Sequence, residues 1–397
     1  MNRNTKLNIK NNDTRFLIEI LLCFIALSFC SCGFNNALLD APIGTEPGYI
    51  KNLKLENNRL TFTTEDSTYV HLNYKNRINN TDQYKAWSAG KAKLSHQYHL
   101  PVSAESIDYQ ISLSVTTINN TTVADTTFTF HSTLQNHPFL KVHFINVQQG
   151  DAILIETPEG KNLQIDGGYG TLRDREWQGG GEALALHYLQ AQNISHLDYI
   201  IETHRHEDHW GGLQDITSSS ITHDKYLSPT DRHGYRSGSF LTLESQVSFQ
   251  ILNIGYDPSY SENNRNNESI VLKAKYYDAE FLFTGDAEGE VQEWIYDRGF
   301  DLSADVLKVA HHGANSNSTT DSIYLQTVFD KYAKIAILTY GKNNPYGHPR
   351  ALNRFTNIFT YGQNPVQSTP AGSNYTFDCG NILVLSDGQM VFVTTEK

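Results

Sequence analysis

The sequence predicts an α/β protein preceded by a small all-β domain. Between residues 49 and 136, short segments alternate polar and apolar residues with period two, which is the pattern of antiparallel strands. Further along, a short apolar segment runs into Thr203–Leu213, which is rich in histidine and aspartate and begins a helical pattern. Two later apolar segments also end in an aspartate or in histidines. Strands that end in polar residues and are followed by helices indicate an α/β architecture.

Length, composition and charge exclude several classes of protein. The 397 residues suggest two or three domains, and 39% hydrophobic residues are enough for a globular core. The one apolar run that approaches a membrane span lies at the N-terminus, which excludes a polytopic channel. A net charge of −12 excludes a general electrostatic attraction to nucleic acid. Any polyanion would have to be attracted locally.

Residues 1–32 form a secretory signal segment of lipoprotein type. A basic stretch, Met1–Arg15, precedes the apolar stretch Phe16–Phe29, and a small residue precedes Cys32. We expect Cys32 to be lipidated and the chain to be exported and lipid-anchored at a bacterial cell envelope, on its periplasmic or surface side. Cys30 as the anchor, or an uncleaved single span, remains an alternative. After cleavage Cys379 is the only other cysteine, so no intrachain disulfide is expected.

Residues 33–48 have the proline and glycine content of a linker, and residues 49–136 predict a small β-sandwich. The alternating segments separated by Asn, Asp and Ser turns suggest immunoglobulin or fibronectin type III character. Its histidines, His96, His99 and His131, are scattered, so we expect surface or packing roles. This domain would be a spacer or binding domain whose partner the sequence does not identify.

Residues 137–397 contain the candidate metal-binding and catalytic residues. Within Thr203–Leu213, four ligand-type side chains fall in six positions: His204, His206, Asp208 and His209. Imidazole and carboxylate suit zinc, with iron or manganese as alternatives. Four such residues are too many for one tetrahedral ion that keeps an open position, so two neighbouring divalent ions fit better.

Three further segments supply candidates. Asp166 follows an apolar segment and precedes two glycines, where its carboxylate can orient a ligand histidine. Asp286 ends residues 280–286, and residues 305–314 end in His311 and His312. Because His311 comes first after the strand, we expect it to be the last metal ligand, with His312 facing substrate or leaving group, although the two roles could be exchanged. His348, in a Tyr-Gly-His-Pro loop, could contact a phosphate or act as a general acid.

These motifs together resemble the metallo-β-lactamase superfamily. His-X-His-X-Asp-His with Gly-Gly, Thr-Gly-Asp, Leu-Lys-Val-Ala-His-His-Gly and Tyr-Gly-His-Pro resemble its ComEC-type branch, the hydrolase domain attached to a DNA-uptake channel. The resemblance implies a four-layer αβ/βα sandwich and makes Asp286 the carboxylate that bridges two metals. The metal ligands that the spacing and the resemblance together indicate are His204, His206, Asp208, His209, Asp286 and His311.

One departure from the family pattern leaves the first metal one ligand short. Many relatives have a histidine where this chain has the asparagine-rich residues 263–267. Asn267 could approach the metals or build a turn, and His233 could fold back as a substitute. We expect Lys308 to lie close to the site or the substrate, and with Lys342, Arg350 or Arg173 it could line the cleft and offset its carboxylates.

The resemblance implies a metal-dependent hydrolase in which a metal-bound hydroxide attacks phosphorus or carbonyl carbon. Asp208 would orient the nucleophile, and His312 or His348 would protonate the leaving group. ComEC-like domains are linked with degradation of the non-transported DNA strand, so phosphodiester cleavage, by a nuclease or phosphodiesterase, is the first expectation. Hydrolysis of a small ester, lactone or amide outside the cytoplasm is the second. The third is a surface-binding lipoprotein with a residual site.

Overall fold

The computed structural model describes most of residues 49–397. The exceptions are residues 57, 77–81, 102–107, 120, 132–137, 172–181, 256–263, 315–334, 351, 353–354, 356–357 and 367–373. All described residues belong to one compact unit, Leu38–Lys397. The predicted signal segment with Cys32, the predicted linker and Arg173 lie outside the described residues. Within the described part of the chain, no helix has both the length and the apolar character needed to cross a membrane.

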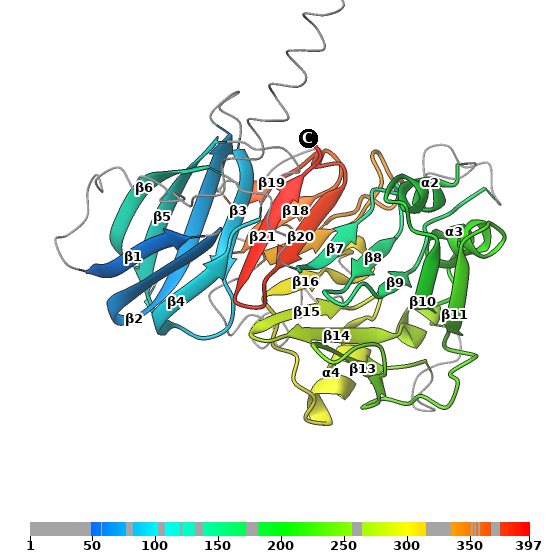
Figure 1. The fold of residues 1–397 in the computed structure, drawn as a ribbon. Helices are drawn as coiled ribbons and strands as arrows, with labels where there is room; N and C mark the ends of the chain where they lie inside the picture. The colour runs from blue at the N-terminus through cyan, green and yellow to red at the C-terminus, as the bar shows by residue number, and fades with distance from the viewer. Residues whose placement is uncertain are drawn as a thin grey trace, which may run out of the picture. The chain divides into compact units, whose positions relative to one another are not determined.

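Six antiparallel strands occupy the N-terminal part of the described chain, at the left of Figure 1. The long β2 organises them: its first half pairs with β1 and β4, and its second half pairs with β3 and β5. Every second residue of its second half, Val70, Leu72 and Tyr74, is buried, as the period-two pattern predicts. The immunoglobulin or fibronectin character stays a prediction. The strands are β1 (Ile50–Glu56), β2 (Arg59–Asn76), β3 (Asp82–Ser88), β4 (Lys93–His99), β5 (Asp108–Thr117) and β6 (Thr122–His131).

These strands continue into the first sheet of the remaining chain. Its order is β11-β10-β9-β8-β7-β20-β21-β3-β2-β5-β6, and β3 pairs antiparallel with the C-terminal β21. Trp87 of β3 packs on Phe359 with ring centroids 4.6 Å apart. The boundary predicted at residues 136 and 137 is therefore spanned by backbone hydrogen bonds and shared core. The further strands are β7 (Leu140–Phe144), β8 (Ile153–Glu156), β9 (Asn162–Ile165), β10 (His196–Ile201), β11 (Thr222–Leu227), β20 (Ile382–Ser386) and β21 (Met390–Thr395).

The second sheet has the order β12-β13-β14-β15-β16-β17-β18-β19. Its strands run parallel from β15 to β19, whereas β12 to β15 are antiparallel. The strands are β12 (Phe240–Leu241), β13 (Val247–Asn253), β14 (Val271–Tyr276), β15 (Ala279–Phe283), β16 (Val306–Lys308), β17 (Ile335–Leu338), β18 (Phe359–Gly362) and β19 (Tyr375–Thr376).

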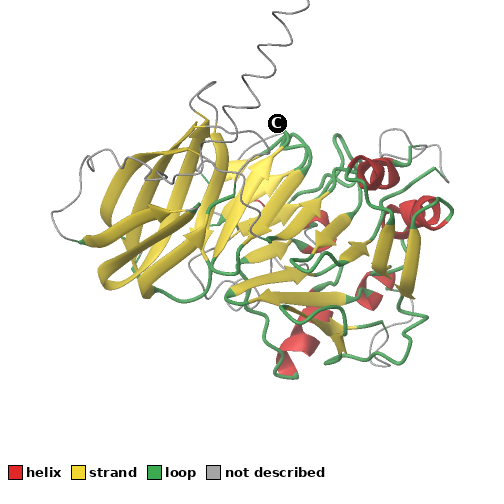
Figure 2. Cartoon of the chain, in the orientation of Figure 1, coloured by secondary structure: helices red, strands yellow, loops and turns green. Residues whose placement is uncertain are grey.

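Helices cover the outer faces of the two sheets (Figure 2). Alternate strand residues divide between cores: Phe281 and Phe283 of β15 face the core between the sheets, whereas Leu282 packs in the core that includes α4. On the first sheet, Leu197 and Ile200 of β10 pack in the core that contains residues of α2 and α3. The layers are consistent with the predicted α/β class. The helices are α2 (Leu184–Ala191), α3 (Glu207–Thr217) and α4 (Gly289–Asp297), with short 3-10 turns η2 (Arg265–Glu268) and η3 (Ala310–Gly313).

The candidate site lies at the carboxyl ends of strands from both sheets. Asp166 directly follows β9, and His204 comes three residues after the end of β10. Asp286 comes three residues after β15, and His312 comes four residues after β16. Parallel strands present their carboxyl ends at one edge, which is where α/β proteins build ligand sites. Packing the two sheets face to face therefore brings these residues together.

Candidate metal centre and active site

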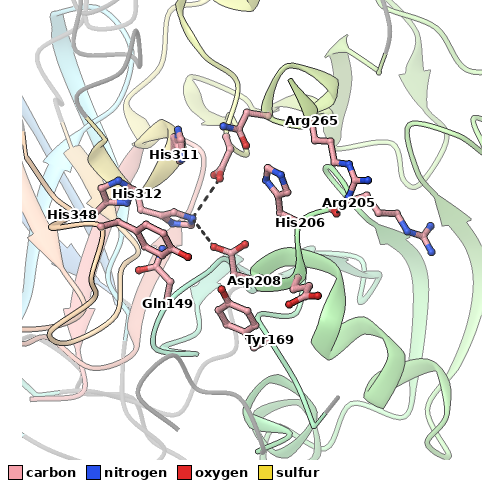
Figure 3. A pocket seen from close by; sticks show the side chains of 13 residues that line it. Gln149, Tyr169, Arg205, His206, Asp208, Arg265, His311, His312 and His348 are labelled. Atoms are coloured by element: carbon pink, nitrogen blue, oxygen red, sulfur yellow. Dashed lines mark hydrogen bonds and ion pairs between the residues drawn. The ribbon is translucent and has the colours of Figure 1, made fainter. Parts of the chain in front are cut away.

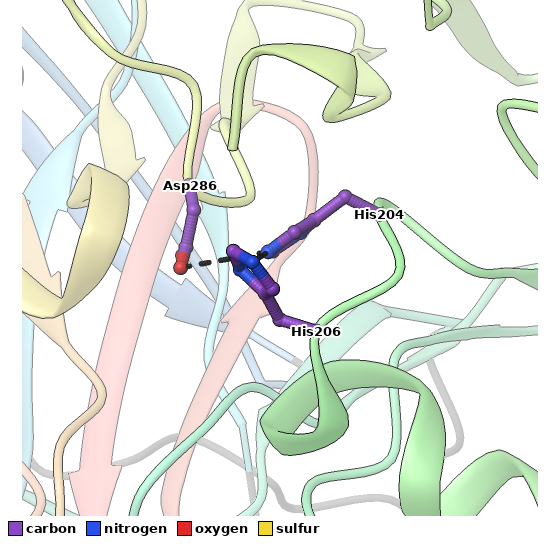
Figure 4. Close-up of side chains that lie close together, drawn as sticks. All are labelled: His204, His206 and Asp286. Carbon is purple, nitrogen blue, oxygen red and sulfur yellow. Dashed lines mark hydrogen bonds and ion pairs between the residues drawn. The ribbon is translucent and has the colours of Figure 1, made fainter. Parts of the chain in front are cut away.

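The first group of metal-ligand side chains is His204, His206 and Asp286. His204 is fully buried in the turn after β10, and His206 is the extended residue that caps the N-terminus of α3. The two imidazoles converge, with His204 Nε2 3.0 Å from His206 Nδ1. Asp286 approaches from the second sheet, and its Oδ2 lies 3.8 Å from His204 Nε2 (Figure 4).

The second group is Asp208, His209 and His312. Asp208 and His209 stand in the first turn of α3, so one helix start delivers both. His312 Nε2 lies 3.4 Å from Asp208 Oδ2, a pair marked by a dashed line in Figure 3, and 3.5 Å from Asp286 Oδ2. His209 Nε2 lies 3.2 Å from the same Asp286 oxygen. Asp286 thus stands between the two groups, where the family resemblance puts a bridging carboxylate.

The structure places the two adjacent histidines differently from what their expected roles require. His312, predicted to face substrate, is buried among the ligand atoms, and its Nδ1 lies 2.8 Å from the Thr339 carbonyl oxygen. His311, predicted as the last ligand, is partly exposed, and its Nδ1 lies 3.5 Å from Glu288 Oε1. Strand β16 ends at Lys308, and both histidines have left-handed backbone, with φ of 47° and 53°. That turn swings the second imidazole inward and the first toward the pocket.

Asp166 fixes the orientation of His209. It accepts hydrogen bonds from the Thr203 backbone N–H at 2.8 Å and the Thr203 hydroxyl at 2.6 Å, and its Oδ2 lies 2.7 Å from His209 Nδ1. The start of α3 can approach Asp166 because glycines on both segments let the two backbones pack in direct contact. A Cβ on Gly167 would lie 2.6 Å from the backbone carbon of Gly212. A carboxylate behind a ligand histidine sets its tautomer and raises its basicity.

Lys308 and Asp151 form a buried ion pair beneath the ligand groups. The Lys308 ammonium also donates to the Gly285 carbonyl at 2.9 Å and lies 3.7 Å from Asp286 Oδ1. Asp151 accepts a hydrogen bond from the Thr339 hydroxyl at 2.6 Å. Asp151 was not predicted from the sequence, because its partners come from β16 and the end of β17. Lys308 is buried and supports the carboxylates instead of lining the cleft.

The asparagine-rich turn does not replace the missing histidine. Asn267 accepts a hydrogen bond from the Glu288 backbone N–H at 3.2 Å and donates to Glu290 at 3.3 Å, so it builds the turn. Asn266 lines the pocket and donates to Glu288 Oε1 at 2.9 Å. His233 lies at the surface with its Nε2 2.7 Å from the Tyr226 carbonyl oxygen, so it does not fold back as a substitute.

The electrostatics of the groups favour a cation. Burial lowers the pKa of His209, but the carboxylates of Asp286, Asp166 and Asp208 outweigh burial and raise it well above its usual range. The pKa of His312 rises to about 9, because Asp286 and Asp208 again outweigh burial. Burial raises the pKa of Asp286, but His209 and His312 overcome this effect and hold it well below its usual range. A field that favours imidazolium also favours a divalent ion.

The residues present fit divalent metal ions. Among the described residues, His209 Nε2, His312 Nε2 and Asp286 Oδ1 are buried polar atoms without a hydrogen-bond partner, and buried polar atoms are rarely left so. The donors are imidazole nitrogens and carboxylate oxygens, which suit zinc, manganese or iron. The clusters are therefore candidate metal-binding groups.

The ligand groups open into a pocket of about 370 Å³. Figure 3 shows Arg205 and Arg265 beside His206, with His311, His312 and His348 on the other side. His348 therefore lies where the sequence predicts, on the pocket wall, and burial, then His312 and His311, lowers its pKa to about 3. Lys342 and Arg350 do not belong to the described lining. Its side chains are Gln149, Tyr169, Arg205, His206, Glu207, Asp208, Arg265, Asn266, Asp286, His311, His312, Tyr346 and His348.

Comparison with known proteins defines the class. Residues 145–259 match the family model of the metallo-beta-lactamase superfamily. Within it the chain is ComEC-like, as two curated relatives indicate. It is 28% identical over 237 residues to ComE operon protein 3 of Bacillus subtilis (strain 168), covering 53% of this chain and 29% of that protein. It is 29% identical over 164 residues to competence protein ComA of Neisseria gonorrhoeae, covering 41% of this chain and 22% of that protein.

The chain thus spans less than a third of the length of either curated relative. Among solved structures, a diphosphatase from the PhnP family aligns over 57% of this chain and 80% of that chain, with 13% identity and a TM-score of 0.29. That likeness is too low to carry an argument. The resemblance to the superfamily and to its ComEC-like branch, predicted from the motifs, is confirmed by the family model and the curated relatives.

Proposed function

We propose that the chain is a metal-dependent phosphodiesterase, with nucleic acid as its substrate class. The observation that carries the proposal is the position of Asp286 between two groups of ligand side chains at the base of one pocket. Superfamily members with such groups are metal-dependent hydrolases, which supports the proposed reaction type more strongly than the proposed substrate. The motifs shared with the ComEC type and the competence proteins among the relatives favour phosphodiesters.

Two divalent ions, zinc first and manganese or iron as alternatives, are proposed as the cofactors. His204, His206 and Asp286 would hold one, and Asp208, His209, His312 and Asp286 would hold the other. Bound there, such ions lower the pKa of a water molecule and stabilise negative charge on the substrate oxygens. The first group has fewer protein donors, because the asparagine turn is hydrogen-bonded to Glu288 and Glu290.

The chain's own residues divide the remaining tasks. Asp208 lines the pocket beside His312 and can accept the proton of an attacking water and orient it. Asp166 keeps His209 in place, and Lys308 neutralises the charge shared by Asp151 and Asp286. His348, on the pocket wall, is neutral at physiological pH and can donate a hydrogen bond to a phosphate or leaving-group oxygen.

We further propose that the protein acts outside the cytoplasm, anchored to the cell envelope through a lipid on Cys32. The basic and apolar segments before Cys32 support this, and residues 1–32 lie outside the described structure. A Cys32→Ala protein should lose both labelling by a fatty-acid probe and membrane association. If labelling persists, the lipid anchor is Cys30. If membrane association persists without labelling, the anchor is an uncleaved helix.

A substrate screen tests the proposed class. Purified protein loaded with zinc or manganese is assayed against DNA, RNA, bis-p-nitrophenyl phosphate, lactones and nitrocefin. We expect turnover of the three phosphodiesters and none of the lactones or nitrocefin. Turnover confined to lactones or other small esters would overturn the proposal and favour a small-molecule hydrolase. No turnover by a metal-loaded protein would favour a binding lipoprotein with a residual site.

A further inference from the structure

Two arginines give this acidic protein a local cationic wall at the pocket. The chain carries a net charge of −12, and the pocket is lined by three carboxylates, Glu207, Asp208 and Asp286. Within the described lining, the arginine and lysine side chains are Arg205 and Arg265 alone. Neither arginine was predicted from the sequence as a site residue. Arg205 stands between the first two histidines of the metal motif, and Arg265 stands in the asparagine-rich turn.

Contacts on one side of the Arg205 guanidinium position it and leave N–H donors for a further partner. Its guanidinium lies 3.4 Å from the buried Glu202 carboxylate and 5.0 Å from the ring of Trp210, and about half of its side chain is exposed. Glu202 itself accepts a hydrogen bond from the Tyr226 hydroxyl at 2.6 Å, so the anchor is fixed. A guanidinium carries several N–H donors in a planar fork, and one carboxylate contact leaves donors for another anion.

Arg265 joins Arg205 through the backbone. Its guanidinium donates to the Arg205 carbonyl oxygen at 3.3 Å, which holds the Arg265 charge against the turn that carries His204 and His206. In Figure 3 both arginines lie on the His206 side of the pocket, away from His311 and His348.

We propose that Arg205 and Arg265 bind a second phosphate of the substrate, next to the phosphodiester that is cleaved. This inference rests on the proposed phosphodiesterase function and narrows its substrate to chains with at least two phosphates. In Figure 3 both guanidinium groups lie beyond His206 as seen from Asp208 and His312, which favours contact with a neighbouring phosphate over contact with the reacting one. Paired guanidinium groups suit a phosphate because they donate parallel hydrogen bonds to its oxygens.

Three dinucleotides test the inference: thymidylyl-thymidine, which has one phosphate, and its 5′-phosphorylated and 3′-phosphorylated forms. The metal-loaded full chain should cleave one phosphorylated form with a kcat/KM roughly tenfold above that of the plain dinucleotide, as two charged hydrogen bonds allow. In Arg205→Ala and Arg265→Ala this ratio should fall toward one, mainly through KM. Arg236→Ala removes an exposed arginine outside the pocket and should keep the wild-type ratio.

The results separate this inference from the proposed function. A ratio near one in the wild type, or an unchanged ratio in both pocket variants, would overturn the role of the arginines while phosphodiester cleavage stands. If no dinucleotide is cleaved, the proposed function fails. Binding of a fluorescent oligothymidylate then tests the arginines directly: anisotropy should show roughly tenfold weaker binding and a shallower salt dependence in the pocket variants. Equal binding by the wild type and both variants would overturn the inference.

Discussion

His209 and Asp166 are both fully buried, and Nδ1 of the histidine lies 2.7 Å from Oδ2 of the aspartate. This contact joins the first turn of α3 to the end of β9. It leaves Nε2 of His209 facing Asp286 at 3.2 Å. The ligand side of the imidazole is therefore set by a residue that does not itself reach the pocket.

Replacing Asp166 should weaken metal binding without removing a proposed ligand. We expect Asp166→Asn to lower zinc affinity about 10-fold to 100-fold, as is typical for loss of a carboxylate behind a ligand histidine. Competition with a chromophoric chelator measures the affinity. Asp301→Asn removes a carboxylate that pairs with Lys273 away from the pocket, and it should bind zinc like the wild type. Equal affinities in all three proteins would contradict the orienting role.

The two adjacent histidines should differ in metal content. His312→Ala removes a side chain among the ligand atoms and should release much of the metal from the Asp208 and His209 group. His311→Ala removes a partly exposed pocket residue and should retain it. Elemental analysis after dialysis gives the metal content of each. Greater loss from the His311 variant would restore the assignment first expected from the sequence.

Lys308 should matter for stability. Lys308→Met leaves the buried Asp151 without its ammonium partner and removes a positive charge near Asp286. Breaking a buried pair by removing one partner destabilises a protein by about 3–5 kcal/mol. Urea unfolding of the metal-free proteins measures the loss, and the exposed Lys342→Met serves as the control. A difference below about 1 kcal/mol would mean that the pair contributes little.

The N-terminal strands should make stability depend on pH through His96. Its Nδ1 lies 2.8 Å from the Tyr98 hydroxyl, and burial, then Lys93, lowers its pKa from 6.5 to about 4. Between these values the unfolded chain binds more protons than the folded chain. This contribution is therefore complete above pH 6.5 and is lost as the pH falls toward 4.

From pH 7 to pH 5 the free energy of unfolding should fall by about 2 kcal/mol more in the wild type than in His96→Gln. Urea unfolding at the two pH values measures both falls. Parallel losses in the two proteins would show that His96 takes up its proton in the folded state as readily as in the unfolded chain.

The sequence predicted the residues that follow strands directly. Asp166, His204 and Asp286 stand at or near the ends of apolar segments that are visible in the sequence, so their convergence follows from the sheets. Asp151 was missed because its contacts with Lys308 and Thr339 join segments more than 150 residues apart. Such contacts leave no local pattern.

Three other features could not be inferred, for different reasons. The positions of His311 and His312 depend on left-handed backbone conformation at both residues. Histidine rarely adopts this conformation, so the sequence does not predict it. The pairing of β3 with β21 joins opposite ends of the described chain, and both strands read alone as ordinary alternating segments. Arg205 was not predicted because arginine, although it lies between two ligand histidines, is not itself a metal ligand.

The most direct test of the account is hydrolysis of bis-p-nitrophenyl phosphate by the metal-loaded protein, compared with Asp208→Asn and Asp286→Asn. The wild type should turn over this substrate. Asp286→Asn should lose activity together with metal from both groups, and Asp208→Asn should lose activity by about 100-fold or more, because an amide accepts no proton from the attacking water. Asp301→Asn should match the wild type. A wild-type protein that carries its metal but leaves this phosphodiester intact, or equal turnover in all four proteins, would contradict the account.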